Sequence, residues 1–124
     1  MADPNIANTG TLKLDGSSGA ITTSAQSVVD NAAASAKSVK IVSLYVTNIN
    51  ASNSATVTAG RYSAASLGGT SYKIANTLTI PVGTTVVLID ENSPVYVKEN
   101  QSFGILGSAN TTLEWVASYQ VINE

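Results

Sequence analysis

The chain contains no cysteine and no histidine, and charged residues make up only 11% of its 124 residues. The absence of cysteine excludes disulfide bonds, thiolate nucleophiles, zinc–thiolate sites and iron–sulfur clusters. The absence of histidine removes the Ser-His-Asp and Cys-His nucleophile arrangements and imidazole metal sites. No serine precedes a lysine at the S-x-x-K spacing, and there is no phosphate-binding glycine loop and no calcium loop. We therefore predict no catalytic residue, no cofactor and no metal site.

The few charges are scattered along the chain. Six Lys and Arg residues stand against eight Asp and Glu, without the basic cluster that nucleic-acid binding requires. Ser, Thr and Asn instead supply 41 of the 124 residues. Because the cores of protein interfaces are depleted in Lys, Glu and Asp, this surface suits a subunit packed among others. An ordinary β-protein with a neutral surface explains the same composition equally well.

The length fits a single domain. At 12.7 kDa, folding buries roughly two-thirds of the surface of the unfolded chain, which suffices for a core without disulfides. No window approaches the ~18 apolar residues of a membrane span, so we expect no membrane association. The first ten residues have neither a basic stretch nor an apolar run and do not look like a signal peptide, so we expect folding in the cytoplasm.

The hydrophobic residues recur with a period of two, which indicates β-strands. Residues 72–80 are expected to direct Tyr72, Ile74, Leu78 and Ile80 towards a core. Residues 113–121 are expected to do the same with Leu113, Trp115, Ala117, Tyr119 and Val121. Residues 40–48 are more continuously apolar, which predicts a central strand buried on both faces.

Shorter β-branched or apolar runs complete the pattern, with a bulge predicted at Gly60. They lie at 11–14, 24–30, 55–62, 84–89, 94–98 and 102–107. Gly, Pro or Asn separates them at Asp15-Gly16, 50–53, 67–70, 81–83, 92–94, Asn100-Gln101 and Ala109-Asn110.

Eight or nine short antiparallel strands at this spacing predict an all-β fold, a single β-sandwich or jelly-roll-like domain. We place this domain at residues 11–124. Residues 1–10 lack a core-facing pattern and are expected to form an extended N-terminal arm. Residues 31–37 are expected to form a loop with at most one helical turn, with Asn31 in a capping position.

Two other functions remain as alternatives at this stage. Glu99 and Glu114 are a carboxylate pair for a small hydrolase, although solvated surface carboxylates explain them more simply. A carbohydrate-binding or adhesive module would stack exposed tyrosines on a sugar, and Tyr62 and Tyr96 are the candidates. Tyr72, Trp115 and Tyr119 share their faces with Leu and Ile and are expected in the core instead.

Five stretches carry a resemblance to a known family: Met1–Ile6, 41–48, 80–100, 108–110 and 117–119. Together they resemble a family of small virion structural proteins of marine tailed phages, of the cyanophage type. The resemblance covers nearly the whole chain and consists of strands and turns. The chain departs from the family where Asn100-Gln101 stands in a turn that often carries Gly-Asp.

The resemblance implies a component of the virion, foremost a capsid decoration (cement) protein that binds the outer shell. Its partners would be the major capsid protein or other virion proteins, and its own assembly a homotrimer. A neck, tail or tail-fibre component is the alternative. The predicted interface residues are Ala2, Asp3, Pro4, Asn5 and Ile6 of the arm, which would extend a neighbour's sheet, together with Tyr62 and Tyr96.

Overall fold

The computed structural model describes residues 11–123 and shows nine strands and no helix among them. The strands are β1 (Thr11–Ile21), β2 (Gln26–Asn31), β3 (Lys37–Asn48), β4 (Ala55–Ala64), β5 (Gly68–Ile80), β6 (Thr85–Ile89), β7 (Val95–Val97), β8 (Gln101–Gly107) and β9 (Leu113–Asn123).

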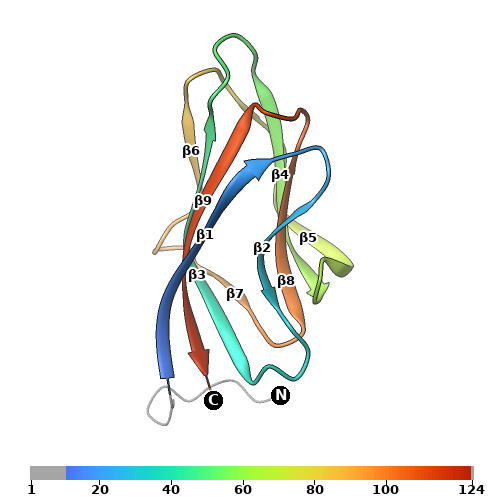
Figure 1. The fold of residues 1–124 in the computed structure, drawn as a ribbon, viewed down its shortest axis with the longest axis vertical. Coiled ribbons are helices and arrows are strands. Elements are labelled where there is room, and N and C mark those ends of the chain that lie inside the picture. Colours follow the sequence, from blue (N-terminus) through green and yellow to red (C-terminus); the bar gives the residue numbers. More distant parts are fainter. Residues whose placement is uncertain (1–10, 124) are drawn as a thin grey trace.

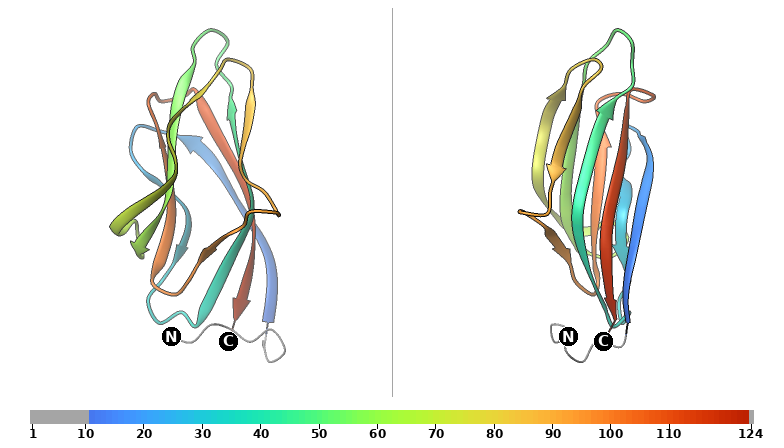
Figure 2. Two further views of the ribbon diagram at one scale, coloured as in Figure 1. Left: turned by 180° about the vertical axis from the view of Figure 1, so that it is seen from behind. Right: turned by 90° about the vertical axis from the view of Figure 1, so that its left-hand side faces the viewer.

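Two antiparallel sheets face each other (Figures 1 and 2). The first sheet has the order β1-β9-β3-β6, with β7 pairing along β3 beyond the end of β6. The second sheet has the order β2-β8-β4-β5. The chain crosses repeatedly from one sheet to the other, which is the double-sheet strand order of a jelly roll. The predicted fold class is confirmed.

The core lies between the two sheets and is built from alternate residues of each strand. Phe103 and Ile105 on β8 are fully buried, as are Ile41, Leu44 and Val46 on β3. In β9 the predicted alternation is confirmed, because Leu113, Trp115 and Ala117 are buried while Tyr119 and Val121 pack at the margin of the core. The aliphatic and aromatic residues that define the period in the sequence thus also define the interior.

The first strand is longer than the sequence indicates. Asp15-Gly16, predicted as a turn, lies inside β1 and pairs with Tyr119 and Ser118 of β9. The glycines of this strand serve packing instead of chain reversal. A Cβ at Gly19 would come within 2.7 Å of the Trp115 ring, so its absence lets the indole lie against β1.

The central position of β3 is confirmed, since it lies between β9 and the pair β6 and β7. The prediction that both of its faces are buried is wrong. Tyr45 on the outer face is 41% exposed, because nothing in the described part of the chain covers the outer face of the first sheet there.

The prediction for residues 72–80 is wrong for three of four side chains. Ile80 is buried, whereas Tyr72, Ile74 and Leu78 are 64%, 45% and 39% exposed. β5 is an edge strand, and extra residues in β5 interrupt its regular pairing with β4. Its side chains therefore do not alternate regularly between the two faces, and the facing sheet does not cover these three. The predicted bulge at Gly60 is confirmed, and a Cβ there would lie 2.6 Å from a backbone oxygen of β5.

The segment between β2 and β3 contains no helical turn. Ala34 and Ala36 adopt left-handed backbone conformations, with φ of 58° and 56°, which a right-handed helix does not allow. Asn31 belongs to β2 and donates from Nδ2 to the carbonyls of Lys37 and Val97 instead of capping a helix. The predicted arm at residues 1–10 lies outside the described residues.

Candidate interaction surfaces

The two carboxylates considered for hydrolysis lie far apart. Glu99 accepts a hydrogen bond from the backbone N–H of Ala36 at 2.7 Å, beside the start of β3. Glu114 on β9 pairs with Thr47, near the other end of β3. Ten residues of strand separate these two places, or about 33 Å. The pair therefore does not flank a common substrate site.

No group of three or more Asp or Glu side chains converges within residues 11–123 in a way that would hold a metal ion. Asp90 sits in the turn after β6, where its Oδ1 accepts the N–H groups of Asn92 and Ser93. Its carboxylate is engaged in shaping that turn. In the same residues no helix is both long and apolar enough to cross a membrane.

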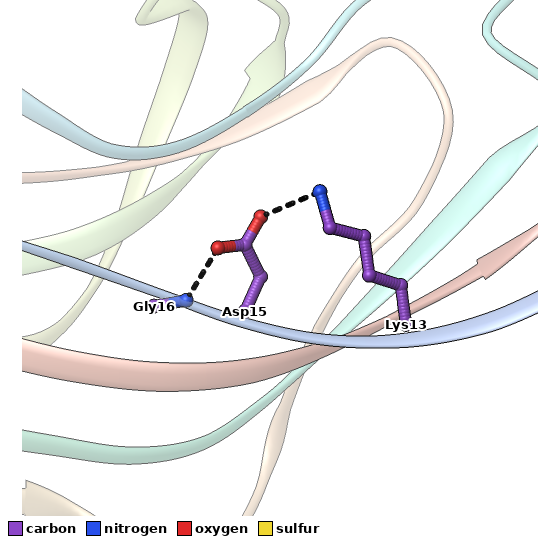
Figure 3. Close-up of polar contacts among 3 residues, drawn as sticks. All are labelled: Lys13, Asp15 and Gly16. Atoms are coloured by element: carbon purple, nitrogen blue, oxygen red, sulfur yellow. Dashed lines mark hydrogen bonds and ion pairs between the residues drawn. The ribbon is translucent and has the colours of Figure 1, made fainter.

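Charged side chains face inward at the lower end of β1. Lys13 and Asp15 are in register with Val121 and Tyr119 of β9, which belong to the inner face of the sheet. The Lys13 Nζ and Asp15 Oδ2 atoms are 3.3 Å apart (Figure 3), and both side chains reach water through a hollow of about 260 Å³ between β1 and β2. An inward-pointing charge on an edge strand discourages pairing with a further strand, so this edge is protected.

The ion pair of Lys13 and Asp15 also affects the pKa values of Asp15 and Tyr119. The backbone N–H of Gly16 and then the ammonium of Lys13 hold the pKa of the Asp15 carboxyl below its usual value. Burial raises the pKa of the Tyr119 hydroxyl, and the negative charge of Asp15 adds to that rise. Asp15 is thus ionised, and Tyr119 neutral, throughout the physiological range.

We expect the Asp15→Asn variant to lose less stability in acid than the wild type. Since the folded pKa of Asp15 is depressed, its stabilising contribution is present above the unfolded value of about 3.9 and is lost as the pH falls through the folded pKa. Urea unfolding between about pH 2.5 and 7 measures this difference. Parallel curves for the two proteins below about pH 4 would contradict the assignment.

The outer face of the first sheet carries exposed apolar side chains, which we call the apolar face. One row across the sheet consists of Ser18, Val116, Tyr45 and Val87, which are directly opposite one another on β1, β9, β3 and β6. The six exposed apolar residues of this face are Leu12 (57%), Leu14 (74%), Tyr45 (41%), Val87 (50%), Tyr96 (50%) and Val116 (52%).

A second row contains Leu14, Gln120, Lys40 and Tyr96 on β1, β9, β3 and β7. Between the two rows lie only the small residues Gly16, Ser118 and Ser43. The apolar face therefore has one row with three adjacent apolar residues and a second row whose polar centre is flanked by Leu14 and Tyr96, with a shallow strip between the rows. Exposed apolar side chains gathered on one face favour an interaction site.

The outer face of the second sheet is different, because the loop between β4 and β5 folds over it. Leu67 lies against Gly104, where a Cβ would meet its Cδ2 at 2.6 Å. The hydroxyl of Ser102 accepts the N–H of Leu67 and donates to the carbonyl of Ala64. Among the described residues, the loop thus covers the second sheet at Ser102 and Gly104, whereas Leu14, Tyr45 and Val116 on the apolar face remain exposed.

The open side of the sandwich forms a second surface. A shallow groove of about 670 Å³ runs between residues 74–79 of β5 and residues 86–88 of β6. The exposed side chains of Ile74 and Leu78 contribute to it. It is the place where two edge strands of opposite sheets diverge from the turn at residues 81–84.

The predicted interface residues fall into three groups. Tyr96 is exposed on the apolar face, whereas Tyr62 is half-buried on β4. Residues 2–6 lie outside the described residues. Sequence reasoning missed Leu14, Val116 and Val87, because alternation alone does not distinguish an outer face that carries apolar residues from an inner one.

Comparison with known proteins yields structural similarity only. No family model matches the sequence, and no curated protein matches it. A chain from Bacillus endospore appendages, described as a novel family of disulfide-linked pili, is similar with a TM-score of 0.52. The two are 14% identical, over 99% of this chain and 100% of that one.

A capsid chain of the T13 particle of the virus IBDV is similar at a TM-score of 0.46. The identity is 10%, over 94% of this chain and 32% of that one. A similarity at this level does not establish a common fold. The appendage chain supports the fold of this protein, which is a jelly roll of nine strands.

Proposed function

We propose that this protein is a non-enzymatic structural protein of a phage virion, and specifically a capsid decoration (cement) protein. In this role it binds the outer shell through the major capsid protein and bridges neighbouring capsomers, as a homo-oligomer and by resemblance a trimer. The observation that carries the proposal is the apolar face, which leaves six large apolar side chains in water in a chain of low charge. Such a surface gains stability when a neighbouring protein covers it.

The resemblance to small virion proteins of marine tailed phages supports the viral setting. The appendage chain supports the suitability of the fold, since a subunit of similar size and architecture builds a pilus. This chain has no cysteine, so disulfide bonds do not hold its contacts in an assembly. A shell under internal pressure gains from many such contacts, because each must break before capsomers separate.

Mass spectrometry of purified particles with absolute quantification tests the proposal. We expect on the order of hundreds of copies per particle, because a decoration protein repeats with the symmetry of the shell. About a dozen copies or fewer would instead assign the protein to the neck, the tail or a tail fibre. Absence from purified particles would overturn the virion role.

A carbohydrate-binding or adhesive module is the second candidate, favoured by the exposure of Tyr45 and Tyr96 on one face. Exposed aromatic rings are the usual platform for a sugar face. A glycan array probed with the wild type and with Tyr96→Ala tests it, and binding that the variant loses would support it. An array with no binding would remove this candidate.

A further inference from the structure

The apolar face is complementary to itself. A second copy can approach it face to face, since two sheets pack about 10 Å apart with their strands nearly aligned. If a twofold axis runs along the strands between β9 and β3, each row meets the same row of the partner in reverse order. Val116 then lies over the partner's Tyr45, and Tyr45 over the partner's Val116.

The same operation brings the ends of the second row together. Leu14 on β1 meets the partner's Tyr96 on β7, which pairs two side chains that are 74% and 50% exposed in the single chain. Gly16 meets the projecting turn with Asp90 and Glu91, beside a hollow of about 380 Å³ at Ser43 and Tyr45. A residue without a side chain therefore lies where the partner's turn needs space, and the hollow beside that turn faces the partner's small residue Ser118.

We infer that a second copy of this chain packs on the apolar face, with a twofold axis along the strands. The charges agree with this arrangement. Lys40 and Glu114 are the charged residues in the paired rows of the face, and they meet the partner's Gln120 and Thr47. Within the paired rows no like charges are brought together, and the turn with Asp90 and Glu91 meets the uncharged Gly16, so little salt dependence is expected.

Other modes of self-association are less favoured by the structure. Lys13 and Asp15 protect the lower edge of β1, and the second sheet carries its own loop on its outer face. A face-to-face pair also leaves the β5 edge and the groove free for a ring or a shell contact. The inference does not rest on the proposed function, because any setting that concentrates the protein would form the pair.

The area of the interface limits the affinity of the pair. Four strands about 4.8 Å apart and the four rows from Leu14 to Ala20, about 6.7 Å apart, cover roughly 500 Å² per copy. The total of roughly 1,000 Å² is at the lower end for a specific interface, so the pair should form reversibly at micromolar concentration.

Sedimentation velocity on the full chain from about 1 to 500 µM tests the inference. We expect the wild type to pair, Val116→Glu to weaken pairing at least roughly 30-fold, and Val82→Glu to behave as the wild type. Val82 is the matched control, because it is 41% exposed in the turn between β5 and β6 and outside the apolar face. Thermal melting of the three proteins establishes that each is folded.

Mixing two variants distinguishes the proposed twofold geometry from a general effect of losing apolar surface. Val116→Glu and Tyr45→Lys should each pair at least roughly 30-fold more weakly than the wild type. Their mixture should form a one-to-one pair, since the twofold axis places residue 116 against the partner's residue 45. A wild type that stays single at about 500 µM would overturn the inference. So would trimers unaffected by Val116→Glu, or a mixture that fails to pair. Absence of the protein from virions would contradict the proposed function but not this inference.

Discussion

Replacing Phe103 with alanine is expected to lower the free energy of unfolding by about 3–5 kcal/mol. Phe103 is the largest fully buried side chain and lies on β8, between β2 and β4. Its removal leaves a cavity at the centre of the second sheet in addition to the lost burial of the ring. Since a domain of this size has about 5–15 kcal/mol of stability, the loss is a large share of the total.

Urea unfolding of the wild type and the variant measures the difference, with an unchanged slope taken as a sign that the same surface is exposed. Phe103→Leu is the control, because it keeps most of the apolar volume and should cost clearly less. Val116→Ala, on the apolar face, should change stability by less than about 0.5 kcal/mol in the single chain. A loss below about 1 kcal/mol for Phe103→Ala would contradict the position of the core.

Much of the fold follows from the sequence because strands with one buried face have a period of two. The segment at 113–121 is the best case, since β9 is a central strand and its inner residues meet both neighbours and the facing sheet. The turns with Gly, Pro or Asn at 50–53, 81–83 and 92–94 also fall between strands as predicted.

The wrong burial predictions have one physical cause, which is that exposure depends on topology. Tyr72 and Leu78 belong to an apolar alternation, yet β5 is at an edge and the facing sheet does not cover them. In β1 the apolar side chains of the alternating pattern point away from the core and the charged ones point towards it. Leu14 is therefore 74% exposed, while Asp15 faces inward. Local sequence does not determine which strand is at an edge or which face of it is inside.

The candidate surface was therefore predicted only in part. Tyr96 is on the apolar face as an exposed residue, but its neighbours Leu14 and Lys40 come from strands more than 50 residues away. Such rows form only when β1, β9, β3 and β7 pair, so their composition cannot be read before the strand order is known. The low charge of the chain was the one property that indicated a contact surface in advance.

Asn48→Ala is expected to cost about 2–4 kcal/mol, because it breaks a buried connection between three segments. Asn48 is 2% exposed at the end of β3. Its Nδ2 donates to the carbonyls of Asn53 and Ile80 at 3.0 and 2.9 Å, and its Oδ1 accepts the N–H of Asn50 at 2.8 Å. The truncation removes a partner of the buried Ile80 carbonyl, which is the costly part of the loss, and also removes the two part-buried hydrogen bonds to Asn50 and Asn53.

Asn53→Ala is the matched control, since Asn53 contributes its backbone carbonyl and should change stability by less than about 0.5 kcal/mol. Asn48→Asp separates hydrogen bonding from packing, because it keeps the shape but places a carboxylate against two carbonyl oxygens. Burial and these oxygens should raise the pKa of the new carboxyl, so the folded state holds a proton that the unfolded state has lost. This variant should therefore recover stability relative to the wild type as the pH is lowered from 7 to about 4.5. No deficit at either pH value would show that Asn48 acts through its volume and not through its donor.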